Sequence, residues 1–180
     1  MITAGVSRRY AKAIFELAVD TGAEETIGRE LQSFSDLVAS SPLGTVLNNP
    51  AYSLAARKNV LTQVTRALQS SPLLVRFVSL LLARRRLSSL TDIARQYKTL
   101  LNQAKGRIEA RVVGATPLDP KTLDRVRAKL GQMSGKEVLL QSETDPGLIA
   151  GLMIELEGKT YDGSVRAYLD ALAEKIEHGN

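Results

Sequence analysis

The spacing of the apolar residues changes once along this chain, at Gly106, and that change limits what the chain can fold into. Before Gly106 the apolar residues recur every three or four positions, which is the period of a helix with one buried face. Between residues 108 and 112 they alternate with charged residues, which is the period of a strand with one exposed face. We therefore predict an α+β protein with two domains, residues 1–105 and 106–180.

The first domain is predicted to be a bundle of six helices. All but the short third helix carry an apolar stripe that can bury one face. The helices fall within residues 6–18, 27–38, 42–49, 60–68, 73–82 and 90–104. Ser71 and Pro72 begin the fifth helix, because proline fits the first helical position. This helix is apolar on nearly all sides, so we expect it to lie centrally or to present one face to a partner.

The second domain is predicted to be a small α+β unit in the order strand, helix, strand, strand, strand, helix. Thr116-Pro117 ends the first strand. Asp119 as the N-cap and Pro120 at the first helical position then begin a helix that stops near Gly135. The apolar side chains of this helix are Leu123, Val126, Leu130 and Met133. A further strand covers residues 138–140.

The last part of this domain is predicted to be a turn, a hairpin and a helix. Residues 145–147 read Asp-Pro-Gly and form the turn, in which we expect Gly147 to adopt a positive φ. Residues 152–157 alternate as a strand, and Gly158 reverses the chain into a second strand. Asp162 and Ser164, on either side of Gly163, are candidate N-caps of the final helix. Its apolar face is Tyr168, Leu169, Leu172 and Ile176.

The segment from Asp145 to Leu172 resembles the C-terminal signature of the delta subunit of ATP synthases, called the oligomycin-sensitivity-conferring protein in mitochondria. The matching positions are Asp145, Pro146, Leu148, Ile149, Gly151, Asp162, Gly163, Ser164, Val165, Arg166 and Leu169. Ala150 and Tyr161 depart from the family's pattern. Residues 9–18 and 77–87 also resemble that family, so the similarity covers essentially the whole chain.

This resemblance implies a non-catalytic stator subunit of the F-type ATP synthase, which joins the catalytic head to the membrane-anchored peripheral stalk and resists rotor torque during proton-driven ATP synthesis. In the family the helical domain captures the amphipathic N-terminal helix of an alpha subunit, and the C-terminal domain holds the end of a b-type stalk subunit. One copy per complex is expected, not a homo-oligomer.

The same resemblance suggests which residues meet these partners. An apolar groove for the alpha-subunit helix would be lined by Tyr10, Ala13, Ile14, Leu17, Arg76 and Leu80, although any one of these residues taken alone is more often part of the core than of a groove. The stalk would be contacted through Leu148, Ile149 and Met153. Turns and packing would be preserved by Asp145, Pro146, Gly151, Asp162, Gly163 and Ser164.

The sequence offers little for catalysis, so we expect no catalytic residue, cofactor, metal or small-molecule substrate. There is no cysteine, which excludes disulfides, thiolate metal sites and cysteine nucleophiles. The one histidine, His178, lies at the C-terminal end. No phosphate-binding loop is present, and Asp145 and Asp162 stand beside the proline and glycine of turns. An enzyme is therefore the least favoured class.

The charge is uneven and raises one alternative function. Residues 1–105 carry 14 basic and 7 acidic residues, net +7, whereas residues 106–180 carry 10 and 12, net −2, and the two sum to +5. A basic domain could belong to a nucleic-acid-binding regulator. The chain lacks the aromatic platform of single-strand binders and the GXXG loop of a KH domain, so we expect no nucleic-acid partner. Arg84-Arg85-Arg86 is interpreted as a solvated helix end, with partner contact or phosphate binding as alternatives.

The chain is expected to associate with a membrane only peripherally. No run approaches the roughly 18 consecutive apolar residues that a membrane span needs. Glu16 and Asp20 argue against a transit peptide, and no apolar signal core is seen. We therefore expect the cytoplasmic side of a bacterial inner membrane, with an organellar inner or thylakoid membrane as the less favoured location.

Overall fold

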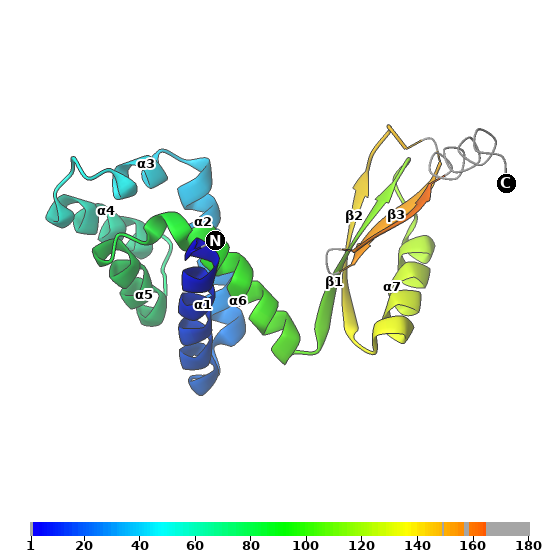
Figure 1. Ribbon diagram of the computed structural model, residues 1–180, viewed down its shortest axis with the longest axis horizontal. Helices are drawn as coiled ribbons and strands as arrows, with labels where there is room; N and C mark the ends of the chain where they lie inside the picture. Colours follow the sequence, from blue (N-terminus) through cyan, green and yellow to red (C-terminus); the bar gives the residue numbers. More distant parts are fainter. Residues whose placement is uncertain (1, 149, 157–158, 165–180) are drawn as a thin grey trace. The chain divides into compact units, whose positions relative to one another are not determined.

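The computed structural model describes residues 2–148, 150–156 and 159–164 (Figure 1). The chain separates into two compact units, which divide between Leu101 and Asn102. This division lies in the last turn of the sixth helix, whereas the sequence placed the boundary after residue 105. The whole protein combines helices with a four-stranded sheet.

The first unit is helical throughout its described residues (Figure 1). Its elements are α1 (Ile2–Asp20), α2 (Glu24–Ser40), α3 (Leu43–Asn48), α4 (Leu54–Ala67), α5 (Pro72–Ala83), the 3₁₀ turn η1 (Leu87–Ser89) and α6 (Leu90–Ala104). The η1 turn was not predicted. Helix α4 starts well before its first predicted apolar residue, because the Ser53 hydroxyl accepts a hydrogen bond from the Ala56 N–H at 3.1 Å and caps it.

Helix α5 packs one side against the helical core and keeps Arg76 and Leu80 exposed on another. Five of its side chains are buried: Leu74, Phe77, Val78, Leu81 and Leu82. They belong to one cluster with Leu31 and Phe34 of α2 and Tyr97 of α6. Tyr97 donates its hydroxyl hydrogen to the Glu24 carbonyl oxygen at 2.8 Å, so the largest buried side chain keeps a polar partner.

The start of α5 is tied to α2 by hydrogen bonds. Ser71 is the N-cap residue and its hydroxyl accepts from the Leu74 N–H at 3.4 Å, which confirms the predicted start at Ser71-Pro72. One carboxylate oxygen of Glu30 on α2 accepts from the Ser71 N–H at 3.0 Å and from the Ser71 hydroxyl at 2.7 Å. A negative charge therefore sits at the positive end of the α5 dipole.

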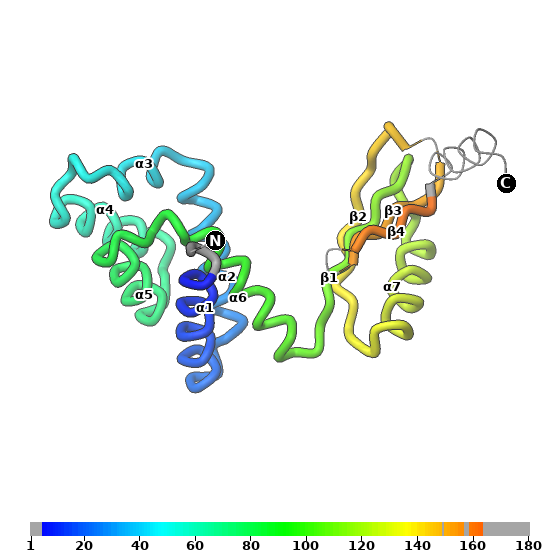
Figure 2. The backbone as a smooth tube through the Cα atoms, viewed as in Figure 1, coloured from blue at the N-terminus to red at the C-terminus, as the bar shows by residue number. Residues whose placement is uncertain are grey.

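The second unit is a sheet with the strand order β2-β1-β3-β4 (Figure 2). The strands are β1 (Arg107–Gly114), β2 (Glu137–Thr144), β3 (Gly151–Leu156) and β4 (Lys159–Ser164). The β1–β2 pair is parallel, and β1–β3 and β3–β4 are antiparallel. Helix α7 (Pro120–Ser134) forms the crossover between the two parallel strands. The predicted strand, helix, strand and hairpin are all present.

The two faces of the sheet differ as the alternation in β1 predicted. On the face toward α7 the buried Ile108 and Ala110 pack with Val138 of β2 and Leu130 of α7. On the opposite face the side chains form ion pairs between strands. Arg107 pairs with Glu137 at 2.9 Å, and Arg111 pairs with Glu143 at 3.2 Å and Glu155 at 3.3 Å. This second face thus carries the ion pairs between strands, although the alternation ends at Val113, which lies on this face and is 2% exposed.

Both ends of α7 follow the predicted caps. Asp119 accepts from the Thr122 N–H at 2.8 Å and from the Thr122 hydroxyl at 2.8 Å. The hydrogen bonds from Thr122, first the N–H and then the hydroxyl, lower the pKa of Asp119. Gly135 ends the helix at φ 67°, a left-handed conformation that favours glycine. Met133, predicted on the apolar face, is instead 66% exposed, because it lies in the last turn of the helix beyond the sheet cluster.

Three predictions near the C-terminus need correction or lie outside the described residues. Asp162, Gly163 and Ser164 belong to β4, where they face Met153, Leu152 and Gly151, so Asp162 and Gly163 do not begin a helix. Continued pairing with β3 outweighs the local capping preference. At Gly163 the backbone of β3 lies close, since a Cβ on residue 163 would be 3.2 Å from the Leu152 carbonyl oxygen. The Gly158 reversal, the final helix and its apolar face lie outside the described residues.

The turn at Asp145 forms by a different backbone conformation from the one predicted. Asp145 accepts from the Gly147 N–H at 2.8 Å through its side chain, and from the Leu148 N–H at 3.0 Å through its carbonyl. Gly147 is not among the residues with positive φ; Gly151, at 96°, is. The glycine requirement therefore lies where β3 begins and not within the turn.

Candidate protein-binding surfaces

One face of α1 and the neighbouring face of α5 form the first candidate surface. Tyr10 of α1 is half-buried and its ring meets Phe77 of α5 edge to face, with centroids 6.3 Å apart. Leu17 remains 52% exposed and Leu80 of α5 44% exposed. Ala13 and Arg76 are exposed as well. Five of the six residues predicted for the groove thus have side chains that a partner can reach.

Ile14 is the sixth, and its side chain is buried within the chain. It is 1% exposed and belongs to the helical core, together with Ala11 and Ala18. These three residues are spaced three and four apart and form one line along α1, facing inward. A second line with the same spacing, through Tyr10, faces outward. The apolar stripe of α1 is wide enough to supply both faces, and the sequence could not separate them.

A hollow of about 390 Å³ lies at one end of this surface. It is lined by Val6, Arg9, Tyr10, Ala13 and Arg86. Val6 and Arg9 were not among the predicted groove residues. The signal was nevertheless present, because Val6, Arg9 and Ala13 recur three and four residues apart on the helix face that also carries Leu17. The hollow places two arginines beside an apolar wall.

The residues predicted to contact the stalk are only partly described. Leu148 lies in the turn after β2, and Met153 lies in β3 opposite Val113 of β1. Both are half-buried. Ile149 lies outside the described residues. Asp145 and Gly151 shape the backbone of this region: the Asp145 carboxylate accepts a hydrogen bond within the turn, and Gly151 has a positive φ.

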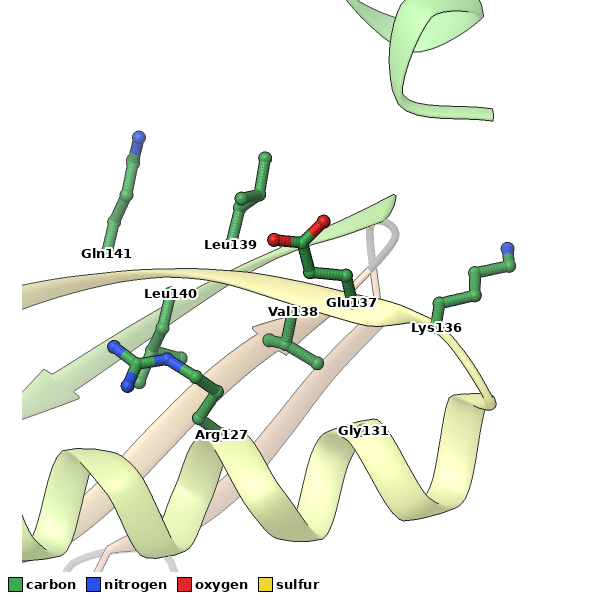
Figure 3. Close-up of a pocket in the computed structure, with 8 residues that line it drawn as sticks. All are labelled: Arg127, Gly131, Lys136, Glu137, Val138, Leu139, Leu140 and Gln141. Atoms are coloured by element: carbon green, nitrogen blue, oxygen red, sulfur yellow. The ribbon is translucent and has the colours of Figure 1, made fainter. Parts of the chain in front are cut away.

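A second hollow runs along β2 beside α7 (Figure 3). Its lining residues are Arg127, Gly131, Lys136, Glu137, Val138, Leu139, Leu140 and Gln141. Figure 3 shows Val138 and Leu140 pointing toward α7, whereas Glu137, Leu139 and Gln141 point away from it. This hollow was not predicted from the sequence.

The outer edge of β2 is available for pairing. Among the described strands none pairs with that side of β2. Glu137 and Asp145 donate their N–H groups inward, to the carbonyls of Gly106 at 3.0 Å and Gly114 at 2.9 Å. Residues at the alternate positions, starting from Val138, therefore direct their N–H and C=O groups outward. Such an edge can accept an added strand.

Comparison with known proteins identifies the family. Residues 6–176 match the family described as ATP synthase delta (OSCP) subunit. The chain belongs to this family. The subunit delta of Geobacter sp. strain M21 is 33% identical over 180 residues, covering 99% of this chain and 100% of that protein. The subunit delta of Solidesulfovibrio magneticus is 36% identical over 177 residues, covering 97% of each chain. The resemblance noted in the sequence is thereby confirmed.

A solved structure supports the fold of this delta-family member. A chain of the mitochondrial ATP synthase hexamer of Toxoplasma gondii superposes with a TM-score of 0.72 and 22% sequence identity. The match covers 94% of this chain and 96% of that one. At this identity the match shows that the arrangement of helices and sheet is shared.

The remaining observations on this delta-family protein concern metal sites, membrane spans and two groups of side chains. No group of three or more His, Cys, Asp or Glu side chains in the described part of the chain could hold a metal ion. No helix of that part is long and apolar enough to cross a membrane. Arg84, Arg85 and Arg86 are exposed at the end of α5, as predicted. Burial, with a smaller contribution from the charge of Glu24, raises the pKa of Tyr97, but that residue lies in the core.

Proposed function

We propose that this chain performs its function through two separate protein-binding surfaces, one on each unit. As a member of the delta (OSCP) family it is a stator subunit of the F-type ATP synthase. A stator holds the catalytic head still while the rotor turns, so its task is to bind two partners firmly and to carry force between them.

The helical unit binds the amphipathic N-terminal helix of an alpha subunit on the surface of α1 and α5. The exposure of Leu17 and Leu80 is the observation that carries this proposal. An apolar helix face laid over them would remove the remaining exposed part of each side chain from water, which contributes about 1 kcal/mol per leucine. Tyr10 and Ala13 lie on the same face of α1 and complete an apolar strip with a small residue at its centre.

The C-terminal unit holds the end of a b-type stalk subunit near the loop that joins β2 to β3. Half-buried Leu148 and Met153 are apolar, and each retains accessible surface. The Asp145 hydrogen bonds fix the backbone that presents Leu148. The proposal includes two further points: the first unit is a bundle of six helices, and each unit binds one partner.

The remaining features of the proposed role follow from the same family. The chain carries out no catalysis itself and is present in one copy per complex. It is attached to the membrane peripherally, through its partners, on the cytoplasmic side of a bacterial inner membrane. Support for a bacterial location comes from relatives such as the subunit delta of Myxococcus xanthus, 31% identical over 180 residues.

The test is a titration of the full-length protein with a synthetic N-terminal helix of the alpha subunit from the same organism. Calorimetry would give the affinity, and NMR shifts would map the site. Leu80→Asp should weaken binding strongly in a folded protein, because it places a charge in the apolar contact. Leu54→Asp is the matched control, since Leu54 is 42% exposed but lies on α4.

Two outcomes would contradict the proposal. The first is an unchanged affinity for Leu80→Asp, which would remove this surface from the contact. The second is no saturable helix binding together with tight duplex DNA binding that weakens steeply with salt, which would favour the nucleic-acid-binding alternative.

A further inference from the structure

The hollow at Arg9 and Arg86 has a positive charge that no described carboxylate neutralises through an ion pair. In the described part of the chain no carboxylate forms an ion pair with either arginine, and Arg8, Arg84 and Arg85 nearby in sequence have none either. Some arginines elsewhere are paired, such as Arg95 with Asp92 at 3.3 Å and Arg127 with Asp124 at 2.6 Å, whereas the exposed Arg66 and Arg76 form no ion pair with a described residue either. What distinguishes Arg9 and Arg86 is that they line one hollow together. The hollow is therefore set to accept an anion from outside the chain.

The backbone holds Arg86 in place at the end of α5. Arg85 donates its N–H to the Leu82 carbonyl at 3.1 Å, and Arg86 donates to the Leu81 carbonyl at 2.8 Å. This pair of bonds is a Schellman motif, in which the left-handed position is normally glycine. Here Arg85 occupies it, with φ 55°. The next residue, Leu87, is 2% exposed and anchors the chain in the core.

The walls of the hollow indicate what kind of anion it accepts. Val6, Tyr10 and Ala13 supply apolar surface that continues along α1 toward the exposed Leu17. This surface continues with the apolar Leu17 and Leu80 and one further cation, Arg76, so it is more apolar than charged. The flank of an amphipathic helix matches it, because such a helix has apolar and acidic side chains on adjacent positions. The geometry thus favours a carboxylate attached to a helix.

We propose that Arg9 and Arg86 bind an acidic side chain of the helix that docks on α1 and α5. This inference rests on the proposed function and adds the charge and the position of the partner's contact. Arg9 and Leu17 are eight residues apart (17 − 9), or about 12 Å along a helix. A partner helix lying alongside α1 therefore has its acidic residue about eight positions, or two turns, from the apolar side chain that covers Leu17.

The experiment is a double-mutant cycle between protein and peptide, measured by calorimetry at low and high salt. The protein variants are Arg9→Gln and Arg86→Gln, with Arg66→Gln as the control, because Arg66 is an exposed arginine in the last turn of α4. The peptides are the synthetic alpha-subunit helix and versions in which each acidic residue in turn is replaced by its amide. Circular dichroism checks that each variant is folded.

We expect Arg9→Gln and Arg86→Gln each to weaken binding roughly three- to tenfold at low salt, and less at high salt. One amide peptide should weaken binding to the wild-type protein by a similar factor and should show little further loss with Arg86→Gln. Arg66→Gln should change nothing. Circular dichroism should be unaffected in all three variants.

The possible failures are distinguishable. If the peptide binds the wild-type protein and Leu80→Asp abolishes binding, but the arginine variants bind normally, the charged contact is wrong and the groove stands. Arg9→Gln and Arg86→Gln could instead weaken the binding of every amide peptide by the same factor as they weaken the binding of the parent peptide. In that case no acidic residue of the peptide pairs with these arginines, and the inference is overturned. If the peptide never binds, both proposals fail. Arginine variants that lose only duplex DNA affinity would identify a nucleic-acid contact instead.

Discussion

Glu30 is expected to hold the first turn of α5 in place, and its removal should destabilise the helical unit by about 2 kcal/mol. Its carboxylate accepts two hydrogen bonds from Ser71, at 3.0 and 2.7 Å. A hydrogen bond to a charged group contributes about 1.5–3 kcal/mol when it is well shielded. Glu30 is half-buried, so water can replace part of both bonds, and the estimate for Glu30→Ala is lower than the sum of two. Glu30→Gln keeps a hydrogen-bond acceptor and loses the charge, so we expect this variant to be destabilised by only about 1 kcal/mol.

The assay must report on α5 itself, because the chain has two compact units and a single unfolding transition cannot be assumed. Hydrogen exchange of the α5 amides, followed through urea, measures the free energy of opening that helix. A double-mutant cycle with Ser71→Ala should give a coupling of about 1 kcal/mol between the two residues. Glu16→Gln is the control, because its pair with Lys12 is exposed, at 3.7 Å, and should contribute less than about 0.5 kcal/mol.

A stability for Glu30→Ala within about 0.5 kcal/mol of the wild type would refute this reasoning. So would strict additivity of the Glu30 and Ser71 changes. Either result would mean that the start of α5 is held by its apolar contacts and its serine cap alone.

Three further predictions concern single residues. Burial raises the folded pKa of Tyr97 above its ordinary value of 10.0, so its stabilising effect is complete below about pH 10 and is lost as pH rises further, by about 1.4 kcal/mol per unit; Tyr97→Phe should flatten this fall in alkaline urea melts. The folded pKa of Asp119 is lowered, so its contribution is present above the unfolded value of 3.8 and is lost as pH falls; Asp119→Asn should keep the cap and remove that acid dependence, seen by hydrogen exchange in α7. Arg85→Gly should raise the stability of the helical unit by about 0.5–1 kcal/mol, since φ 55° favours glycine, and a lower melting temperature would contradict this.

Local sequence rules predicted the elements whose ends are chemically marked. Asp119 and Gly135 delimit α7, and the alternation from Ile108 gives β1 its buried and charged faces. The same rules failed where a contact distant in sequence decides. Asp162 has the residue type of a helix cap, but pairing with Met153 keeps it in a strand.

The candidate sites show the same limit. An apolar stripe gives the spacing of side chains but not the face that a neighbouring helix covers, so Ile14 was grouped with Leu17 although one is buried and the other exposed. Arg9 and Arg86 meet in one hollow although they are far apart in sequence. The contacts with the stalk remain predictions.

The order of strands in the sheet also has a consequence for synthesis. Strand β1 emerges first from the ribosome, yet its neighbours follow 30 residues later (Arg107 with Glu137) and 46 residues later (Ala110 with Leu156). The sheet has a high contact order and cannot form until nearly the whole chain has been made. The helical unit is complete by Leu101 and depends on contacts within that stretch. We expect nascent chains stopped before Glu137 to be folded only in the helical part. Under the assignment of partners proposed above, the subunit would then meet the catalytic head before its stalk-binding unit exists.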